Sequence, residues 1–373
     1  MDDAAVLLDR VFFMMRPKSR RFSLPASLLL LMIFPVFLAA ASQCVWTGVD
    51  KIVAVGDLHG AYDSFVEILK GTKVIDDSLL WIGGKTHLVQ MGDIMDRGPD
   101  ARKIFDLLIR LERQAERAGG MVHPLIGNHE MMNITRIALG YPGYVLPEQF
   151  VSFLPDGLRK RREENFAKRV AGIRPADLDR DLSRNEELKK YWQAVMKEDF
   201  EARDAYFGNF NLRYGDWIMN QNAVIKINDI VFVHGGISPE HSQIPLEEIN
   251  SVVRKELRRL SRPEEMLGND PDAPTPMIFD SAGPLWYRDL AWSGEPEFEA
   301  QVDKILANLK ANFIVIAHSY RSGSLVIGEE FMARFQKRVW FIDTGISQVF
   351  GGYLSALIID KGRFIPWGGN DEK

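Results

Sequence analysis

The 373-residue chain is 46% apolar and 26% charged, an ordinary globular composition that excludes wholesale disorder and allows one large core or two small ones. Its formal net charge of -5 gives no basic field of the kind that draws a protein onto nucleic acid, so we expect no nucleic-acid partner. The single cysteine, Cys44, excludes an intramolecular disulfide and a zinc site built from a cysteine cluster.

The N-terminal segment has the order of a secretory signal. Four basic residues within 16–21 precede an apolar run over 22–38, and small residues follow this run. We expect residues 1–41 to be a signal peptide and residues 42–373 to be a periplasmic or secreted domain. The alternative is an uncleaved membrane anchor that holds the domain outside the cytoplasm, since the run is near spanning length. A start at Met14 or Met15 would give the compact form of such a signal.

Behind this segment, short apolar runs alternate with amphipathic helical stretches, which is the pattern of an α/β domain. Six runs rich in Val, Ile and Phe have the length of buried strands. These predicted strands are Lys51–Val55, His87–Met91, Met121–Ile126, Ile230–Val233, Asn312–Ala317 and Val339–Ile342.

A charged segment over about residues 145–210 separates the third predicted strand from the fourth. Apolar residues from Leu188 to Phe200 recur in it at helical spacing. The segment therefore predicts a helical insertion packed on the core, and a lid that faces the substrate is the sharper alternative.

Five of the six predicted strands run straight into a loop with a potential metal ligand. The loops are GDLHG at 56–60, GDIMDRG at 92–98, GNHE at 127–130, HGG at 234–236, and the loop of His318. One Asp or His after a strand is usually a turn residue, but folding alone has no need for five such loops. In open α/β sheets the carboxyl ends of strands line one crevice, so we expect a single cluster. The glycines that start the first three loops suit turns that approach an ion or phosphate closely.

The side chains of these loops are suited to bind two divalent ions. For the first ion the expected ligands are Asp57 and His59, and for the second they are Asn128, His234 and His318. Asp93 is the natural bridge between the ions. The mixture of nitrogen and oxygen ligands suits manganese, iron or zinc and argues against calcium, and we favour manganese. Such a pair would activate a bridging hydroxide for direct attack on phosphorus.

A phosphoryl transfer also needs a proton for the leaving oxygen. His129, next to a predicted ligand, is the best-placed general acid. Asp96, held in the same loop as Asp93, would orient that imidazole and keep it protonated.

The substrate phosphate needs contacts of its own. Arg97 offers a planar fork to the phosphate oxygens, and Asn128 is expected to contact the phosphate as well as an ion. A second arginine contact is expected from Arg288 in GPLWYR, with Arg321 as its rival.

The combination of GDLHG, GDIMDRG and GNHE with HGGISP and a later lone His resembles the phosphoprotein phosphatase family of metallophosphoesterases, over about residues 51–360. GPLWYR and FIDTGIS are similar to the bacterial branch often called Shewanella-like phosphatases. The eukaryotic serine/threonine enzymes have a Ser-Ala-Pro-Asn-Tyr type motif where this chain has Asp343-Thr344-Gly345, so substrate preference does not carry across. Some Shewanella-like members resemble tyrosine phosphatases in activity.

The resemblance implies the calcineurin-like fold, in which two mixed β-sheets pack as a sandwich flanked by helices and gather the ligand loops at one edge. It implies a phosphomonoesterase that acts on phosphorylated proteins, at Tyr and/or Ser/Thr, or on a small phosphoester. One rival is a nucleotide or dinucleoside polyphosphate hydrolase, as in the related diadenosine tetraphosphate hydrolases. A rival of another class is a catalytically silent phosphate-binding module, against which the complete ligand set argues.

Overall fold

The computed structural model of the chain covers most of the predicted mature domain. It describes residues 43–170, 174–262, 264–265, 274–320 and 332–369. The predicted signal or anchor, residues 1–41, lies outside these ranges, and so does Arg321. Within the ranges described, no helix is long and apolar enough to cross a bilayer.

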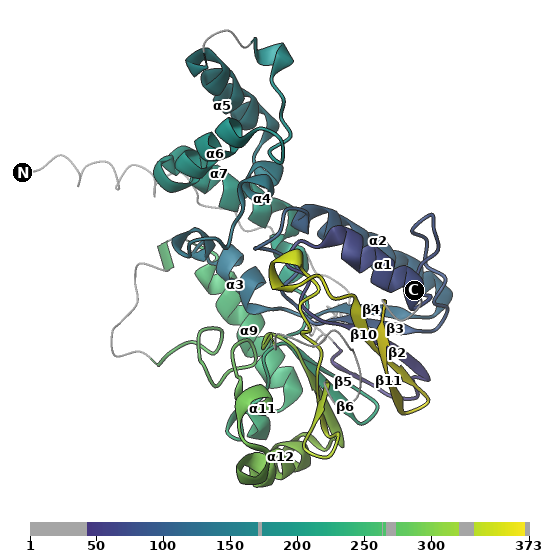
Figure 1. Cartoon of the computed structure of the whole chain (residues 1–373). Coiled ribbons are helices and arrows are strands. Elements are labelled where there is room, and N and C mark those ends of the chain that lie inside the picture. Colours follow the sequence, from purple (N-terminus) through teal and green to yellow (C-terminus); the bar gives the residue numbers. More distant parts are fainter. Residues whose placement is uncertain (1–42, 171–173, 263, 266–273, 321–331, 370–373) are drawn as a thin grey trace, which may run out of the picture. The chain divides into compact units, whose positions relative to one another are not determined.

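The first of two β-sheets joins strands from both ends of the described chain, in the order β11-β10-β2-β3-β4. Its strands are β2 (Lys51–Val55), β3 (His87–Gln90), β4 (Met121–Pro124), β10 (Ser355–Asp360) and β11 (Arg363–Gly368). β2, β3 and β4 run parallel, and β10 pairs antiparallel with both β2 and β11. The crossover helices α1 (Tyr62–Gly71) and α2 (Ala101–Ala118) lie on the outer face of this sheet (Figure 1).

The second sheet has the order β1-β5-β6-β7-β9-β8 among the described residues. Its strands are β1 (Val45–Trp46), β5 (Val224–Ile227), β6 (Ile230–Val233), β7 (Phe313–Ile316), β8 (Ala333–Arg334) and β9 (Val339–Phe341). β6, β7 and β9 are parallel. β5 pairs antiparallel with β6 and parallel with β1, and β8 pairs antiparallel with β9. Helices α9 (Leu246–Leu260), α11 (Asp289–Trp292) and α12 (Glu295–Leu309) flank this sheet (Figure 1).

Aromatic side chains hold the two sheets together. Phe364 of β11 has its ring centroid 4.8 Å from that of Trp340 in β9 and 4.7 Å from that of Phe313 in β7. The central strands are buried on both faces, as β6 shows with every residue from Ile230 to Val233 buried. The chain therefore forms two mixed sheets packed as a sandwich between helices, which confirms the fold that the resemblance implies.

All six predicted strands are confirmed, with small differences at their ends. β4, for example, ends at Pro124 and not at Ile126. Among the described residues, β1, β5, β8, β10 and β11 were not predicted. The residues of β11 are exposed or half-buried along its whole length. This edge strand therefore lacks the continuous apolar run by which the six predicted strands were found.

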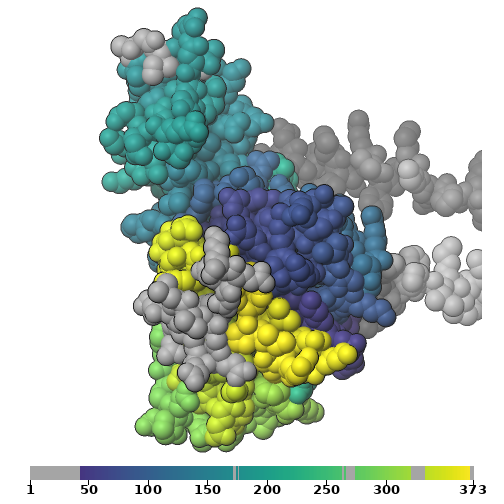
Figure 2. All heavy atoms as spheres, turned by 45° about the vertical axis from the view of Figure 1, so that its right-hand side comes forward, coloured from purple at the N-terminus to yellow at the C-terminus, as the bar shows by residue number. Residues whose placement is uncertain are grey.

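The segment between α3 (Asn128–Ile134) and β5 is largely helical, as its pattern predicts. Its main helices are α4 (Pro147–Phe153), α5 (Asp156–Arg169), α6 (Glu186–Glu198) and α7 (Phe200–Phe210). Figures 1 and 2 show these helices, coloured teal, as a group at the top of the view, above the purple and blue part of the chain that contains α1 and α2. We call residues 147–210 the helical insertion.

The insertion has an aromatic core of its own. The ring of Phe150 in α4 stacks on Tyr206 of α7 at a centroid distance of 5.0 Å and lies 6.4 Å from Trp192 of α6. Phe200 does not belong to this core, because its side chain is 77% exposed. The apolar residues at helical spacing were predicted to continue to Phe200, but the helix does not. Asp199 ends α6 and caps the amino end of α7, where its carboxylate accepts from Ala202 N.

Asn250 of α9 attaches its helix to the edge of β5, and we expect its removal to destabilise the fold. Its buried amide accepts from Ala223 N at 2.7 Å and Val224 N at 3.1 Å, and donates to Val224 O at 2.8 Å. Asn250→Ala leaves these backbone groups buried without partners, which costs about 3 kcal/mol of unfolding free energy. Urea denaturation measures this loss. The control Asn312→Ala removes one exposed hydrogen bond to Asp229, and a loss as small as in this control would contradict the assigned role.

Candidate metal centre

The carboxyl ends of parallel strands from both sheets meet at one cavity of about 210 Å³. Each contributing strand ends in a loop that brings one or more polar side chains to the cavity. The strands and side chains are β2 with Asp57 and His59, β3 with Asp93 and Arg97, β4 with Asn128 and His129, β7 with His318, and β9 with Asp343. His234 follows β6 and lies directly behind, fully buried. The predicted convergence of distant loops is therefore what the structure shows.

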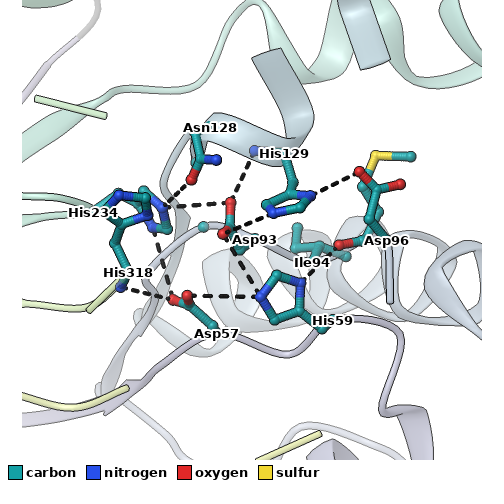
Figure 3. A network of polar contacts seen from close by, with 12 residues as sticks. Asp57, His59, Asp93, Ile94, Asp96, Asn128, His129, His234 and His318 are labelled. Atoms are coloured by element: carbon teal, nitrogen blue, oxygen red, sulfur yellow. Dashed lines mark hydrogen bonds and ion pairs between the residues drawn. The ribbon is translucent and has the colours of Figure 1, made fainter. Parts of the chain in front are cut away.

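Asp93 is at the centre of this cluster (Figure 3). Its Oδ2 lies 3.8 Å from His59 Nε2 and 3.9 Å from His129 Nε2, and its Oδ1 lies 3.4 Å from His234 Nε2. Two donors that bind one ion at about 2.1 Å lie roughly 3 to 4 Å apart, so these separations fit atoms that share ions. The two oxygens face different histidines, which is an arrangement that suits a bridging carboxylate.

Two of the histidines are oriented by the backbone. His59 donates from Nδ1 to Met95 O at 3.1 Å, and His234 donates from Nδ1 to Met91 O at 2.8 Å. Because a carbonyl oxygen only accepts, Nδ1 carries the proton in both rings and Nε2 is left to face Asp93. This is the usual outer support of a metal-binding imidazole.

The donor set fits divalent ions. His318 Nε2 is buried and has no hydrogen-bond partner, although buried polar atoms are nearly always paired. Asn128 Oδ1 lies 3.0 Å from His234 Nε2, which in turn faces Asp93. With His234 neutral, three lone pairs converge there, and a cation or a proton must lie between them.

The pKa values of the histidines follow from their neighbours. Burial, with the nearby His129, lowers the pKa of His59 to about 4. Burial together with the charges of His234 and Arg288 lowers the pKa of His318 well below its usual range. Both imidazoles are therefore neutral near pH 7 and ready to bind metal. The pKa of His234 is raised despite burial, chiefly by Asp93.

The pKa values of the three carboxyl groups are shifted in opposite directions. Burial would raise the pKa of Asp93, but the facing His234, His129 and His59 outweigh it and hold that pKa well below its usual range. Burial and the charge of Asp343 raise the pKa of Asp57 well above its usual range. Burial and the charge of Asp93 raise the pKa of Asp343 to about 7. Three carboxyls so close together are not all favoured in the ionised form, and the metal-free cluster therefore favours protons on Asp57 and Asp343.

The backbone of the ligand loops is in an unusual conformation. His59, Asp93, Asp96, Arg97 and His318 all have a positive φ, between 44° and 66°. Such φ values cost non-glycine residues about 1 kcal/mol or more each and persist only where surrounding structure enforces them. Their concentration at one cavity indicates a site built for function and not for stability.

Glu130 helps to hold the backbone of these loops in this conformation. Its carboxylate accepts from the backbone N–H groups of Asp93 at 2.9 Å, Ile94 at 2.8 Å and Gly127 at 3.0 Å, and so ties two ligand loops together. A Cβ at Gly127 would collide with the Asp93 carboxylate. Glycine therefore permits the approach of a neighbouring loop, whereas the sequence suggested the approach of an ion or phosphate.

His129 and Asp96 form a buried pair beside the ligands (Figure 3). His129 Nδ1 lies 2.8 Å from Asp96 Oδ2. Burial would lower the pKa of His129, but the charge of Asp93 and the hydrogen bond that His129 donates to Asp96 outweigh it and raise that pKa. The protonated imidazole is thus stabilised, with Nε2 on the side of Asp93 and the cavity.

Two arginines line the cavity. Arg97 has its guanidinium carbon 4.3 Å from the ring centroid of Tyr144 and 5.3 Å from that of Phe350, so the planar group packs against two aromatic rings. Its Nε is buried without a partner. Arg288 donates from Nη1 to His318 O at 3.2 Å, and no ion pair to an acid is found for it among the described residues. Both guanidinium groups retain donors for an anion.

Every predicted site residue that the structure describes lies at or beside this cavity; Arg321 lies outside the described residues. Two groups of side chains offer ligand atoms within 4.8 Å of one another: His59, Asp93 and His129, and Asp93, His234 and His318. The second group belongs to the predicted set of the second ion. In the first group His129 stands where Asp57 was expected, and the ligand assignment stays a prediction.

Sequence reasoning missed Asp343 as part of this site. It follows β9, the sixth predicted strand, and is only 4% exposed in the cavity wall. The signal was present, because Asp343 directly follows a buried strand as Asp57 and Asp93 do. Tyr144, which also lines the cavity, follows no strand and had no such signal.

Comparison with known proteins matches this chain to phosphoesterases. The family model of the calcineurin-like phosphoesterases matches residues 50–322. Shewanella-like protein phosphatase 2 of Arabidopsis thaliana is 34% identical over 208 residues, which are 55% of this chain and 51% of that protein, so the match spans about half the length of this relative. Shewanella-like protein phosphatase 1 of Plasmodium berghei is 26% identical over 312 residues, 81% of this chain and 68% of that protein.

Among solved structures, the cold-active protein-tyrosine phosphatase of a psychrophile Shewanella sp. matches with a TM-score of 0.59 and 24% identity. The match covers 88% of this chain and 82% of that chain. At this identity the likeness shows the shared fold.

Asp343→Asn should stabilise the metal-free protein and weaken its affinity for metal. The pKa of Asp343 in the fold is about 7, above the usual value of 3.8, so the native state binds the extra proton and its stability falls as pH rises between these values. Removing the charge should therefore gain on the order of 2 kcal/mol at pH 7.5 and nothing at pH 3.5. Thermal unfolding in chelator measures the gain, and manganese titration measures the loss of affinity. A variant less stable than wild type at pH 7.5 would contradict this account.

Proposed function

The chain belongs to the calcineurin-like phosphoesterase family, and we propose that within it the protein hydrolyses phosphate monoesters on phosphorylated proteins. That it is a metal-dependent phosphoesterase follows from the family together with the Asp and His cluster. The observation that carries the proposal is Asp93, whose two oxygens face histidines from both sheets at a cavity with two arginines.

Two divalent ions fit the donors present, with manganese favoured over iron and zinc. The proposed ligands are Asp57, His59, Asp93, Asn128, His234 and His318. When bound, the ions supply an acidified water as the nucleophile and neutralise charge on the phosphoryl group.

The chain's own residues do the remaining work. Arg97, packed against Tyr144 and Phe350, presents its donors to the phosphoryl oxygens, and Arg288 and Asn128 add contacts from other walls of the cavity. His129 donates a proton from Nε2 to the leaving oxygen, and the carboxylate of Asp96 holds the imidazole by Nδ1. These groups are fixed before substrate arrives, so little reorganisation is needed during reaction.

The volume and the aromatic walls of the cavity favour an aryl phosphate as substrate. A volume of about 210 Å³ takes a phosphoryl group with one attached ring, and is below the roughly 300 Å³ at which pockets for larger ligands begin. Trp286, Tyr144 and Phe350 form aromatic walls. Phosphotyrosine therefore fits better than phosphoserine, in keeping with the tyrosine phosphatase that shares the fold. A dinucleoside polyphosphate would lie largely outside the cavity.

The N-terminal pattern supports activity outside the cytoplasm. A basic stretch, an apolar run and small residues stand in that order within residues 1–41. The protein would then be periplasmic or secreted; the alternative is an anchored form with the same orientation.

His129→Ala should lose turnover by about 10² to 10⁴ fold while it keeps its metal. The side chain donates a proton in our assignment and binds no ion. Turnover of a peptide phosphate and metal content by plasma mass spectrometry decide this together. Because His129 Nε2 lies 3.9 Å from Asp93 Oδ2, equal loss of metal and turnover would show that His129 is a ligand.

A substrate panel should show a kcat/KM about 10-fold higher for phosphotyrosine peptides than for phosphoserine peptides, because an aryl ring gains contacts with the aromatic walls. Dinucleoside polyphosphates should turn over most slowly. Stopped assays with added manganese measure all three, with Asp93→Asn as the background. Activity on dinucleoside polyphosphates alone would favour the nucleotide hydrolase. No turnover above Asp93→Asn on any substrate would favour the silent binding module.

A further inference from the structure

The helical insertion contributes two side chains to the surroundings of the His129 and Asp96 pair. Gln149 of α4 donates from Nε2 to Asp96 Oδ1 at 2.7 Å and accepts at Oε1 from Asp96 N at 2.7 Å. Tyr206 of α7 has its hydroxyl 2.9 Å from Gln149 Nε2 and 2.8 Å from Asn133 Oδ1. Gln149, Asn133 and Tyr206 are 0% exposed, so no bulk water competes for these bonds.

The hydrogen bonds of this network have one consistent direction. Gln149 Nε2 donates to both Asp96 Oδ1 and the Tyr206 oxygen, so the single hydroxyl proton of Tyr206 goes to Asn133 Oδ1. That bond fixes the amide of Asn133 with Nδ2 facing Asp96 Oδ2 at 2.9 Å and His129 O at 3.0 Å. The hydroxyl of Tyr206 thus sets the orientation of both amides that hold Asp96.

The network determines which nitrogen of His129 does the chemistry. Asp96 receives one donor at Oδ1 and one at Oδ2 before the imidazole is counted, as an ionised carboxylate does. His129 Nδ1 must then be a donor to Asp96 Oδ2, which leaves Nε2 as the atom that gives up a proton. A carboxylate free to turn would let the imidazole turn with it.

We propose that Tyr206, Gln149 and Asn133 are positioning residues for proton donation by His129, so that the insertion acts on the departure of the leaving group. This rests on the proposed function, in which His129 is the proton donor. A merely structural role of Tyr206 belongs to its ring, which packs on Phe150 at 5.0 Å. Removing only the hydroxyl therefore separates the two roles.

Tyr206→Phe tests the proposal through the basicity of the leaving oxygen. Proton donation matters most for a strongly basic leaving group, so we expect kcat on an alkyl phosphate to fall about 10-fold. On 4-nitrophenyl phosphate, whose leaving group needs little assistance, the loss should stay under about twofold. KM should change little for either substrate. An equal loss on both substrates would overturn the proposal.

Tyr214→Phe is the matched control. It also removes a single hydroxyl, which donates to Asp106 Oδ1 at 2.7 Å, outside the network. This variant should show no dependence on the leaving group. In a His129→Ala background, Tyr206→Phe should cause no further loss, since the residue acts through His129. The same loss in both backgrounds, or in Tyr214→Phe, would count decisively against a positioning role.

A measurement without turnover separates this proposal from the proposed function. In wild type labelled with ¹⁵N-histidine, the proton on His129 Nδ1 should exchange slowly with solvent. Exchange should be faster in Tyr206→Phe and unchanged in Tyr214→Phe. If wild type hydrolyses no phosphoester, the proposed function fails, whereas unaltered exchange in Tyr206→Phe overturns the positioning role.

Discussion

The buried carboxylate of Asp93 is the group on which the rest of the structure depends. A charge taken out of water is tolerated only when it is paired, and here imidazoles from both sheets surround it. His234 reaches Asp93 from β6 while its other nitrogen holds Met91 O at the end of β3. The contacts that assemble the site therefore also join the two sheets.

Several features of the same cluster lower the stability of the metal-free protein. Asp57 and Asp343 have raised pKa values because their negative charges add to that of Asp93, and five residues around them have a positive φ. Each feature disfavours the metal-free protein. Native proteins accept such costs at functional sites because the remaining core supplies enough stability. The fully buried strands of the sandwich supply it here.

Much of the fold and the site could be predicted because central strands and ligand loops have local signals. A buried strand is a short apolar run, and a candidate ligand such as Asp57 follows closely on one. β11 escaped prediction because an edge strand is half exposed. Gln149 and Tyr206 escaped it because they lie on helices far along the chain, and only tertiary packing brings them to Asp96. Asp343 had the same signal as the other loops, because it directly follows a buried strand, and it was nevertheless assigned no role in the site from the sequence.

The pairing of β2 with β10 joins residues about 300 positions apart in the chain, since Lys51 is the register partner of Asp360. A ribosome makes the first ligand loop long before it makes the strand that completes its sheet. Until almost the whole polypeptide has been synthesised, one edge of β2 has no native neighbour, and the carboxylate of Asp343 does not yet exist. The edge of the sheet beside the loop of Asp57 therefore stays open until the C-terminal strands have been made, and the cavity wall that contains Asp343 can form only late in synthesis.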